Sequence, residues 1–558
     1  MTRPDPVASA ETDTFRRSPS DVMRLARMGS GHPTRLSFLR ILLRRAEAEG
    51  WRCDRPALEL DAAGVGHAVY RVRCAGRIYS LVAFSHDLPD EMRSDRVIAT
   101  AWDATFTLFD GDPTPEDIER LRANVPLQEA GRVTPSELTL ARANRSVRLF
   151  RHVVEALSEG RQPDPQEIAA VGYLMRTTAV YGSGKFGAAD RSSIAARPEL
   201  SVPFQAEMLT VWLIRAFTVD VVEHMARVRG GDRAVALDPA IRRGLGVGNS
   251  TGLGMAPFVV RHPVLLNNWM RAREDALARV RAQPGAGSEA VAGLRRALDD
   301  ATLNARLWHS DHPVQTAKLA DLRRDLARIA ATVDGWDWDC PHPWDAFWRW
   351  GADNLSLEGQ EALLAMLLEP HGSLIDDLAA GMGADEEASF RLDGAMSVGD
   401  LRAILARDYD WALALDFERP ENVARFWYVS EEKLEPRLGE RASEEGAALE
   451  QPLCIARLAS MLARTLDGRP ENEPVATMLL ANPEHRFMVR RAQMAARHPY
   501  AEIRDNLIAA DMLPIDLMRC KLAFFGADRF DPRSDRWVRI NLFQGAPFPD
   551  QIGSESVR

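Results

Sequence analysis

Residues 66–84 read Gly-His-Ala-Val-Tyr-Arg-Val-Arg-Cys-Ala-Gly-Arg-Ile-Tyr-Ser-Leu-Val-Ala-Phe, two runs of alternating side chains separated by Ala75-Gly76. Alternation with period two is typical of half-buried strands, and a short glycine-containing break between two such runs indicates a hairpin. A shorter run at 58–60 precedes them, and the stretch 97–109 fits either another strand or a helix. The sequence therefore predicts an antiparallel meander within a small α+β domain over residues 18–130.

Beyond residue 134, apolar side chains recur mostly with helical spacing. The sequence predicts a mainly α protein, with a large helical domain over 131–558 that follows the α+β domain and a disordered tail over 1–17. The expected helices are 138–157, 164–181, 204–227, 263–282, 288–306, 316–333, 357–368, 398–409, 451–466 and 499–510.

Composition, charge and hydropathy argue against several classes of protein function for this chain. The chain has 558 residues, 46% of them hydrophobic, and a formal charge of −10, so general nucleic-acid binding is not expected. The first 17 residues lack the apolar core of a secretory signal, and the most apolar stretch, 208–225, contains Arg215, Asp220 and Glu223. We therefore expect a bacterial cytoplasmic protein that does not cross a membrane. Its oligomeric state stays open, a homodimer included.

The strongest local anomaly is Arg243-Gly-Leu-Gly-Val-Gly-Asn-Ser-Thr-Gly-Leu-Gly-Met-Ala-Pro257, which places five glycines around Asn249, Ser250 and Thr251. Glycines allow backbone N–H groups to approach a ligand, and a helix N-terminus beyond the loop favours an anion. No strand is expected before the loop and its spacing is not that of a dinucleotide site. The sequence predicts an anion-binding loop, with a flexible connection as the alternative.

A second glycine–serine segment is Arg176-Thr-Thr-Ala-Val-Tyr-Gly-Ser-Gly-Lys-Phe-Gly187. Only four of the 70 basic residues are lysines, which makes Lys185 a candidate for a role that guanidinium cannot fill. We expect Lys185 to act as a base or an anion clamp, Tyr181 or Ser183 to carry a proton, and Arg176 to pair with the substrate. The alternative is a glycine turn that caps a helix.

A third segment, Gly29-Ser-Gly-His-Pro-Thr-Arg35, enters a helix and brings His32 and Arg35 to its start. In the helix expected after Pro263, Asn267 and Arg271 are four residues apart, so we expect them on one face near the glycine-rich loop.

These observations lead to one hypothesis. The three segments converge on a small anionic substrate bearing a carboxylate, phosphate or sulfonate, with Lys185 or Ser250 as base or nucleophile, and Tyr181 and His32 also in catalytic roles. No cofactor motif is present, so the hypothesis is a cofactor-independent enzyme without a metal, with a lyase favoured. Large helical lyases of the aspartase and fumarase type are similar in using a mobile Gly–Ser loop, but their sequence pattern is not reproduced at 248–257. The alternatives are a nucleotide-dependent phosphotransferase and a non-catalytic helical scaffold that uses the five tryptophans of 336–350.

Overall fold

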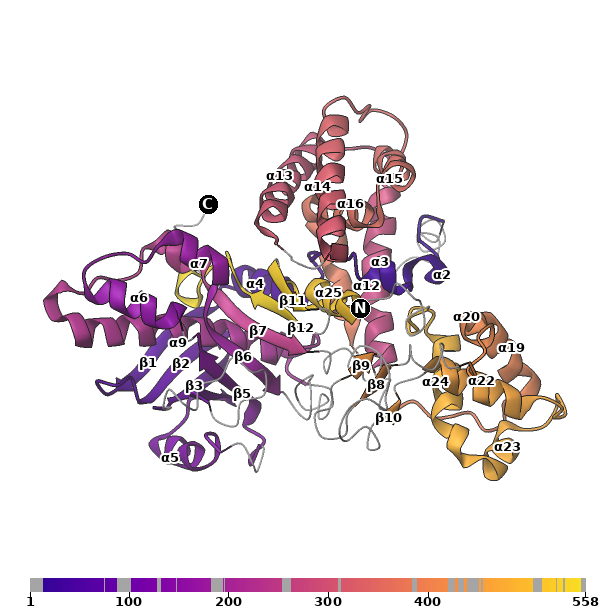
Figure 1. The fold of residues 1–558 in the computed structure, drawn as a ribbon, viewed down its shortest axis with the longest axis horizontal. Coiled ribbons are helices and arrows are strands. Elements are labelled where there is room, and N and C mark those ends of the chain that lie inside the picture. Colours follow the sequence, from indigo (N-terminus) through magenta and orange to yellow (C-terminus); the bar gives the residue numbers. More distant parts are fainter. Residues whose placement is uncertain are drawn as a thin grey trace. The chain divides into compact units, whose positions relative to one another are not determined.

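In the computed structural model, the chain divides into two compact units (Figure 1). Unit 1 comprises 1–36, 252–524 and 532–538, and unit 2 comprises 37–251, 525–531 and 539–558. The structure describes residues 14–74, 76–87, 102–127, 132–146, 148–181, 194, 196–252, 262–309, 313–383, 389–419, 427–429, 436–438, 451–452, 455–504, 514–527, 529–534 and 537–552.

Unit 2 is built on a nine-stranded sheet with the order β1-β2-β3-β4-β5-β6-β7-β12-β11. Its strands are β1 (Arg52–Leu60), β2 (Gly66–Cys74), β3 (Arg77–Ser85), β4 (Ala104–Asp110), β5 (Glu137–Arg145), β6 (Tyr173–Tyr181), β7 (Gly246–Gly252), β11 (Arg529–Ser534) and β12 (Trp537–Leu542). Strands β1 to β6 pair antiparallel in sequence order, whereas β6 and β7 pair parallel. The predicted meander is confirmed, because β2 and β3 pair from Gly66↔Ser85 to Cys74↔Arg77.

Helices cover both faces of this sheet. The long α9 (Gln205–Gly230) lies along one face, where Phe217 makes edge contacts with Tyr70 and Phe106. On the other face, Leu121 and Val125, in and just after α5 (Pro115–Asn124), pack with the strand residues Val82, Phe84, Phe109 and Leu140. The remaining helices of unit 2 are α4 (Phe38–Ala48), α6 (Leu149–Ser158), α7 (Pro165–Val171) and α10 (Pro239–Gly244).

Two expected helices are wrong in part. Residues 138–145 of the expected helix 138–157 belong to β5, and residues 173–181 of the expected helix 164–181 form β6. Nearly every residue of β5 is buried, so both of its faces read as apolar, and periodicity does not separate such a strand from a buried helix. The domain boundary expected at residue 130 therefore falls between β4 and β5, two paired strands of one sheet.

Unit 1 is mainly helical. Its helices α13, α14, α15 and α16 form one group, and α19, α20, α22, α23 and α24 form another (Figure 1). The helices are α2 (Pro19–Val22), α3 (Leu25–Met28), α12 (Pro263–Arg281), α13 (Ser288–Leu307), α14 (Pro313–Val333), α15 (Pro343–Asn354), α16 (Leu357–Leu368), α17 (Gly372–Ile375), α19 (Val398–Asp408), α20 (Asp410–Leu413), α22 (Ile455–Leu466), α23 (Val475–Ala481), α24 (Arg486–Arg497) and α25 (Pro514–Phe525). A small sheet of β8 (Trp427–Val429), β9 (Pro436–Leu438) and β10 (Gln451–Pro452) belongs to the same unit.

Most helices expected in unit 1 are present, with 357–368 matched at both ends by α16. The expectation of a helix at 499–510 is wrong for residues 501–504, which are not helical, and 505–510 lie outside the described residues. The disordered tail expected at 1–17 is wrong for Arg16 and Arg17, which make ion pairs. Residues 1–13 are outside the described part, but Arg16 pairs with Asp275, and Arg17 pairs with Glu274 and Glu361.

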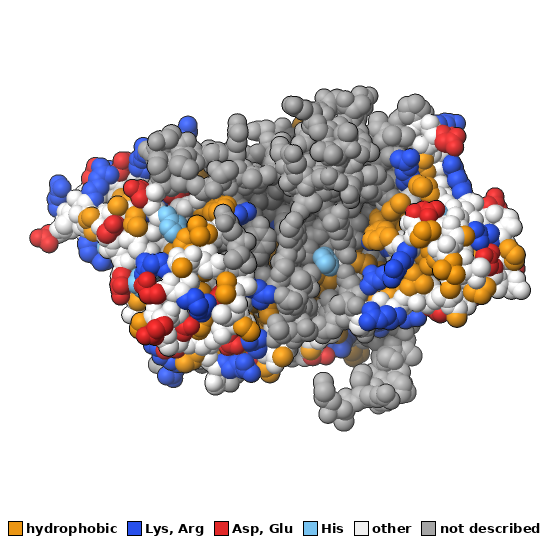
Figure 2. Space-filling model, turned by 90° about the horizontal axis from the view of Figure 1, so that it is seen from below, with side chains coloured by type: hydrophobic (Ala, Val, Ile, Leu, Met, Phe, Trp, Pro, Cys, Tyr) orange, Lys and Arg blue, Asp and Glu red, His pale blue; other side chains and the backbone are white. Residues whose placement is uncertain are grey.

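Cationic and anionic side chains are interspersed over the described face in Figure 2.

The five tryptophans of 336–350 include Trp336, which contacts Trp338, Phe347 and Trp350 with ring centroids 4.9–6.5 Å apart, so these rings pack largely on one another. Among the described helices, none combines the length and the low polarity that a bilayer span requires.

Candidate functional site

Two of the three predicted segments meet in the sheet of unit 2. Arg176 of β6 pairs with Gly248 of β7, and Thr177 pairs with Asn249. The expected helix end is thus a strand, and the expected loop is a second strand beside it. Because the two strands are parallel, β6 ends at Tyr181 and β7 ends at Gly252 on the same edge of the sheet. In open α/β sheets, ligands bind beyond the carboxyl ends of parallel strands.

Side chains link these two strands. The amide of Asn249 donates to the hydroxyl of Thr177 at 3.2 Å, and that hydroxyl donates to the carbonyl of Gly248 at 3.4 Å. Arg176 is only 4% exposed, so its guanidinium brings a positive charge into the interior of unit 2. A buried charge is stabilised by polar partners, so the β6–β7 pair carries a charged side chain and hydrogen-bonding side chains within unit 2.

The glycines of β7 are explained by close packing. A Cβ at Gly248 would lie 2.7 Å from the ring of Tyr173, and a Cβ at Gly246 would overlap Asn541 and the carbonyl of Leu542. The prediction that both glycines belong to a ligand-binding loop is therefore wrong for the described residues, because they allow a strand to fit between β6 and β12.

Arg215 of α9 fixes the chain directly before β7. Its guanidinium donates to the carbonyls of Leu245 at 2.6 Å, Arg243 at 2.9 Å and Ala546 at 2.8 Å, and it lies 3.9 Å from the ring centroid of Phe548. Burial lowers the pKa of Arg215 to about 9. Arg215, which interrupts the apolar stretch 208–225, therefore has a structural role: it holds the backbone directly before β7 in place.

Several predicted site residues lie outside the described structure. Ser183 and Lys185 are outside the described residues, and so are the side chains of Tyr181, Ser250 and Thr251, whose backbones belong to β6 and β7. The roles predicted for these five residues stay predictions.

The third segment, 29–35, belongs to unit 1, whereas Arg176 and Asn249 belong to unit 2. Arg35 holds the carboxylate of Asp376 with hydrogen bonds of 3.0 Å from Nε and 2.6 Å from Nη2. This bidentate pair gives Arg35 a structural partner within unit 1 instead of the substrate that the sequence analysis expected.

His32 lies in a polar region of unit 1. Its ring stacks on Trp308 at 5.6 Å between centroids, and its Nε2 atom is buried without a hydrogen-bond partner among the described residues. Burial lowers the pKa of His32 to about 4, while the charge of Glu358 raises it and that of Arg519 lowers it. A neutral imidazole with an unpaired nitrogen is a possible proton acceptor.

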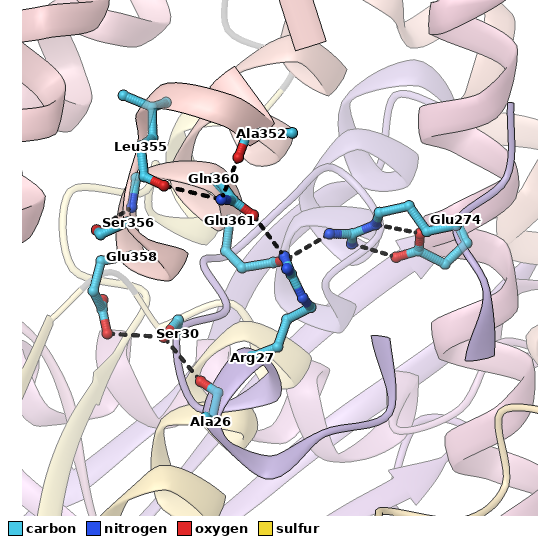
Figure 3. A network of polar contacts seen from close by, with 12 residues as sticks. Ala26, Arg27, Ser30, Glu274, Ala352, Leu355, Ser356, Glu358, Gln360 and Glu361 are labelled. Carbon is cyan, nitrogen blue, oxygen red and sulfur yellow. Dashed lines mark hydrogen bonds and ion pairs between the residues drawn. The ribbon is translucent and has the colours of Figure 1, made fainter. Parts of the chain in front are cut away.

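Close to His32, two carboxylates from the first turns of α16 organise buried charges (Figure 3). Glu358 accepts two hydrogen bonds of 2.6 Å from Arg519 and one of 2.9 Å from the hydroxyl of Ser30. Lys318 lies 4.0 Å from Glu358 and 2.7 Å from Asp516. Burial opposes ionisation of Glu358, but the neighbouring positive charges, Arg519 first and then Lys318, together lower the pKa of the carboxyl group.

The second carboxylate, Glu361, joins three arginines. It accepts from Arg27 at 3.0 Å (Figure 3). It also accepts from Arg17 at 2.7 Å and from Arg273 at 2.6 Å. Burial opposes its ionisation, but Arg17 and Arg273 more than compensate, and the pKa of Glu361 is well below its ordinary value. Arg17 also holds Glu274 through two hydrogen bonds. This network ties the N-terminal segment to α12 and α16.

The last two predicted site residues, Asn267 and Arg271, differ in their exposure to solvent. Asn267 is 2% exposed and accepts from the backbone N–H of Tyr500 at 2.9 Å. Arg271 has a side chain 58% exposed and lies 3.7 Å from Asp275. The expectation that both residues present one ligand-binding face of α12 is wrong, because this long helix is buried at Asn267 and meets solvent at Arg271.

Sequence reasoning missed the charged cluster around Glu358, near His32. Glu358, Asp516 and Arg519 are ordinary charged residues on helical patterns, and nothing local distinguishes them from surface residues. Lys318 and Lys521 carried a signal, since lysines are scarce in this chain. Burial lowers the pKa of Lys521 to about 7.

Comparisons with known proteins add no constraint, since no protein family, curated protein or solved structure matches this chain. Among the described residues, no group of three histidine, cysteine, aspartate or glutamate side chains could hold a metal ion.

Proposed function

We propose that this chain is a cofactor-independent enzyme that acts on a small anionic molecule, a carboxylate or a compound bearing a phosphate or sulfonate, with a lyase reaction favoured. The observation that supports the proposal is the parallel pairing of β6 and β7. It brings the carboxyl ends of the two strands that carry Arg176 and Asn249 to one edge of the sheet. The Lys185 segment follows the first of these strands directly in sequence.

Each residue has a role in this proposal. Arg176 supplies positive charge to the substrate anion, and Asn249, held by Thr177, donates to negative charge that develops during the reaction. Lys185 or Ser250 abstracts the proton beside the carboxylate or acts as nucleophile, and Tyr181 transfers the proton. Elimination then forms a carbon–carbon double bond as the leaving group departs.

A thermal-shift screen of the full chain tests the proposal, with succinate, malate, inorganic phosphate and methanesulfonate as probes. We expect at least one anion to raise the melting temperature of the natural chain. Asn249→Asp places a negative charge beside Thr177 and should raise the anion concentration needed for half the effect at least tenfold.

Asn541→Asp is the matched control. Asn541 belongs to β12 and lies against Gly246, at the opposite end of β7, so the same charge change there should leave the anion response intact. An unchanged response in Asn249→Asp, or no response to any anion, would contradict the proposal. Hits are then assayed for a lyase reaction by the ultraviolet absorbance of a conjugated product. A shift with Mg-ATP alone would instead favour the phosphotransferase alternative.

A further inference from the structure

Two cysteines lie on neighbouring strands at one edge of the large sheet of unit 2. Cys53 belongs to β1, the outermost strand, and Cys74 is the last residue of β2, the next strand of the sheet. Cys53 pairs directly with Val72 of β2, and Cys74 follows Val72 by two residues. Directly paired residues lie on the same face of a sheet, and so do residues two apart on one strand. The two thiols are therefore diagonal neighbours on one face.

Two observations describe how close the thiols are. Diagonal neighbours on antiparallel strands have Cα atoms about 7–8 Å apart, with the Cβ atoms somewhat closer. Burial and the nearby negative charges, that of a Cys74 thiolate among them, raise the pKa of Cys53 to about 12. Neither cysteine belongs to a disulfide, which would require Cα atoms about 4.4–6.8 Å apart. The two sulfurs thus lie close enough to interact, but too far apart to bond directly without movement of the backbone.

A metal ion between the two sulfurs bridges a wider gap than a disulfide does. Two metal–sulfur bonds, each about 2.3 Å long where the ion is zinc, take the place of one sulfur–sulfur bond of about 2.0 Å. Thiolate sulfur is a soft ligand and selects soft metal ions. In the described part of the chain, no third histidine, cysteine, aspartate or glutamate completes a ligand set, so the geometry favours an ion that takes two ligands.

The charges around the thiols indicate the charge of the ion. Those that act most strongly on each thiol are negative, and together with burial they raise the pKa of both cysteines to about 12; they belong to Asp54, Asp550, Glu49 and Glu199, with Arg77 acting in the opposite direction on Cys74. Reactive thiolates need positive surroundings, so this pair is not suited to act as a nucleophile. A divalent ion replaces two thiol protons without a change of net charge, whereas a monovalent ion leaves an anion that burial disfavours.

We propose that Cys53 and Cys74 form a binding site for a soft divalent metal ion that takes two sulfur ligands, as mercury(II) does. Binding breaks two S–H bonds, forms two metal–sulfur bonds and releases both protons to the solvent. Cys53 is partly exposed at the edge of the sheet, which gives the ion access from solvent. Strands β3, β4 and β5 separate this site from β6 and β7, so this proposal and the proposed anion site succeed or fail separately.

Native mass spectrometry of the full chain tests the site after equilibration with mercury(II) in excess glutathione. Glutathione has one thiol, so it competes with any single cysteine of the protein, but less well with a pair that binds through two sulfurs at once. We expect one mercury ion per chain in place of two hydrogen atoms, with an ultraviolet absorbance band from sulfur-to-mercury charge transfer. Zinc(II) should not be retained under the same conditions, because it requires further ligands.

Cys53→Ser and Cys74→Ser should each weaken mercury binding at least about tenfold, and the double variant should bind no more weakly than either single variant, since one substitution already removes the pair. Cys340→Ser is the matched control, because it makes the same replacement at a partly exposed cysteine outside the pair, and it should bind normally. If Cys74→Ser does not fold, Cys53→Ser tests the site alone at the more exposed position.

The proposal is overturned if the natural chain retains no mercury in glutathione, if Cys53→Ser retains it, or if Cys340→Ser loses it. A chain lighter by two hydrogen atoms and without metal would show that the two cysteines form a disulfide instead, which also overturns the proposal.

Discussion

Arg519 of α25 holds the carboxylate of Glu358 of α16 through two parallel hydrogen bonds of 2.6 Å. Both side chains are buried, and Lys318 adds a third charge 4.0 Å from the same carboxylate. The two residues are 161 positions apart in sequence, so their ion pair joins α16 to α25. It therefore connects distant parts of unit 1 at the position where His32 and Ser30 also lie.

Glu358→Gln should destabilise unit 1. The amide leaves Arg519 buried without its anion, and loss of one member of a buried ion pair typically costs about 3–5 kcal/mol. The measurement is thermal and urea unfolding of the full chain. Glu119→Gln, at a carboxylate whose side chain is 72% exposed, should change stability by less than about 0.5 kcal/mol. An equally small change in Glu358→Gln would show that the ion pair does not stabilise the fold.

The pH dependence of stability should report the burial of His32. Its pKa is about 4 in the folded chain, against an ordinary value of 6.5, so the unfolded chain binds the proton more readily between these values. Stability should therefore fall as the pH drops from 7 to 4.5, by about 2–3 kcal/mol from this residue. The lowered pKa values of Glu358 and Glu361 stabilise the folded chain at neutral pH, and this contribution is lost only as the pH falls below about 4.5, which separates the two effects.

His32→Phe isolates this contribution, because phenylalanine retains a ring against Trp308 and does not titrate. Its unfolding free energy, measured in urea between pH 4.5 and 7, should vary less with pH than that of the natural chain. His309→Phe, at an exposed position, should keep the natural dependence. Parallel curves for His32→Phe and the natural chain would contradict the assignment.

The sequence predicts part of this fold well. The meander at 66–84 is predicted correctly because two short alternating runs flank the Ala75-Gly76 break, and these runs are β2 and β3, although most positions of both strands are buried. Most helices expected in unit 1 are also present. The central strands β5 and β6 are predicted as helices because burial on both faces, along β5 and at residues 173–177 of β6, removes the alternation. Local pattern does not contain the long-range pairing that decides between the two structures.

The site was predictable to a smaller extent. Arg176 and Asn249 were selected for their glycine-rich surroundings, and they do lie on adjacent strands, although Gly246 and Gly248 serve packing. His32 was selected as a loop residue, but its environment depends on Glu358, which is 326 positions away in sequence. Such a cluster arises from tertiary packing, which no local motif records.

Gly248→Ala tests the packing explanation for the glycine-rich strand. A Cβ at this position would lie 2.7 Å from the Tyr173 ring, and overpacking of this kind typically costs about 1–3 kcal/mol. The melting temperature should fall, and the smaller side chain of Tyr173→Val should recover part of the loss when combined with it. Gly285→Ala, where nothing lies within 4 Å of the added atom, should leave stability nearly unchanged. Full stability of Gly248→Ala would indicate that the strand has room at this position.

Lys185→Met should abolish turnover of any anion identified by the screen while leaving the melting temperature within about 2 °C of the natural chain, because a residue that acts in chemistry contributes little to packing. Lys318→Met removes another scarce lysine and should behave in the opposite way. It leaves Asp516 without its cation, so the melting temperature falls and the anion response per folded molecule is retained. Rates and melting curves measured on the same preparations distinguish the two. Normal turnover in Lys185→Met would remove this lysine from the mechanism and leave Ser250 as the remaining candidate for base or nucleophile.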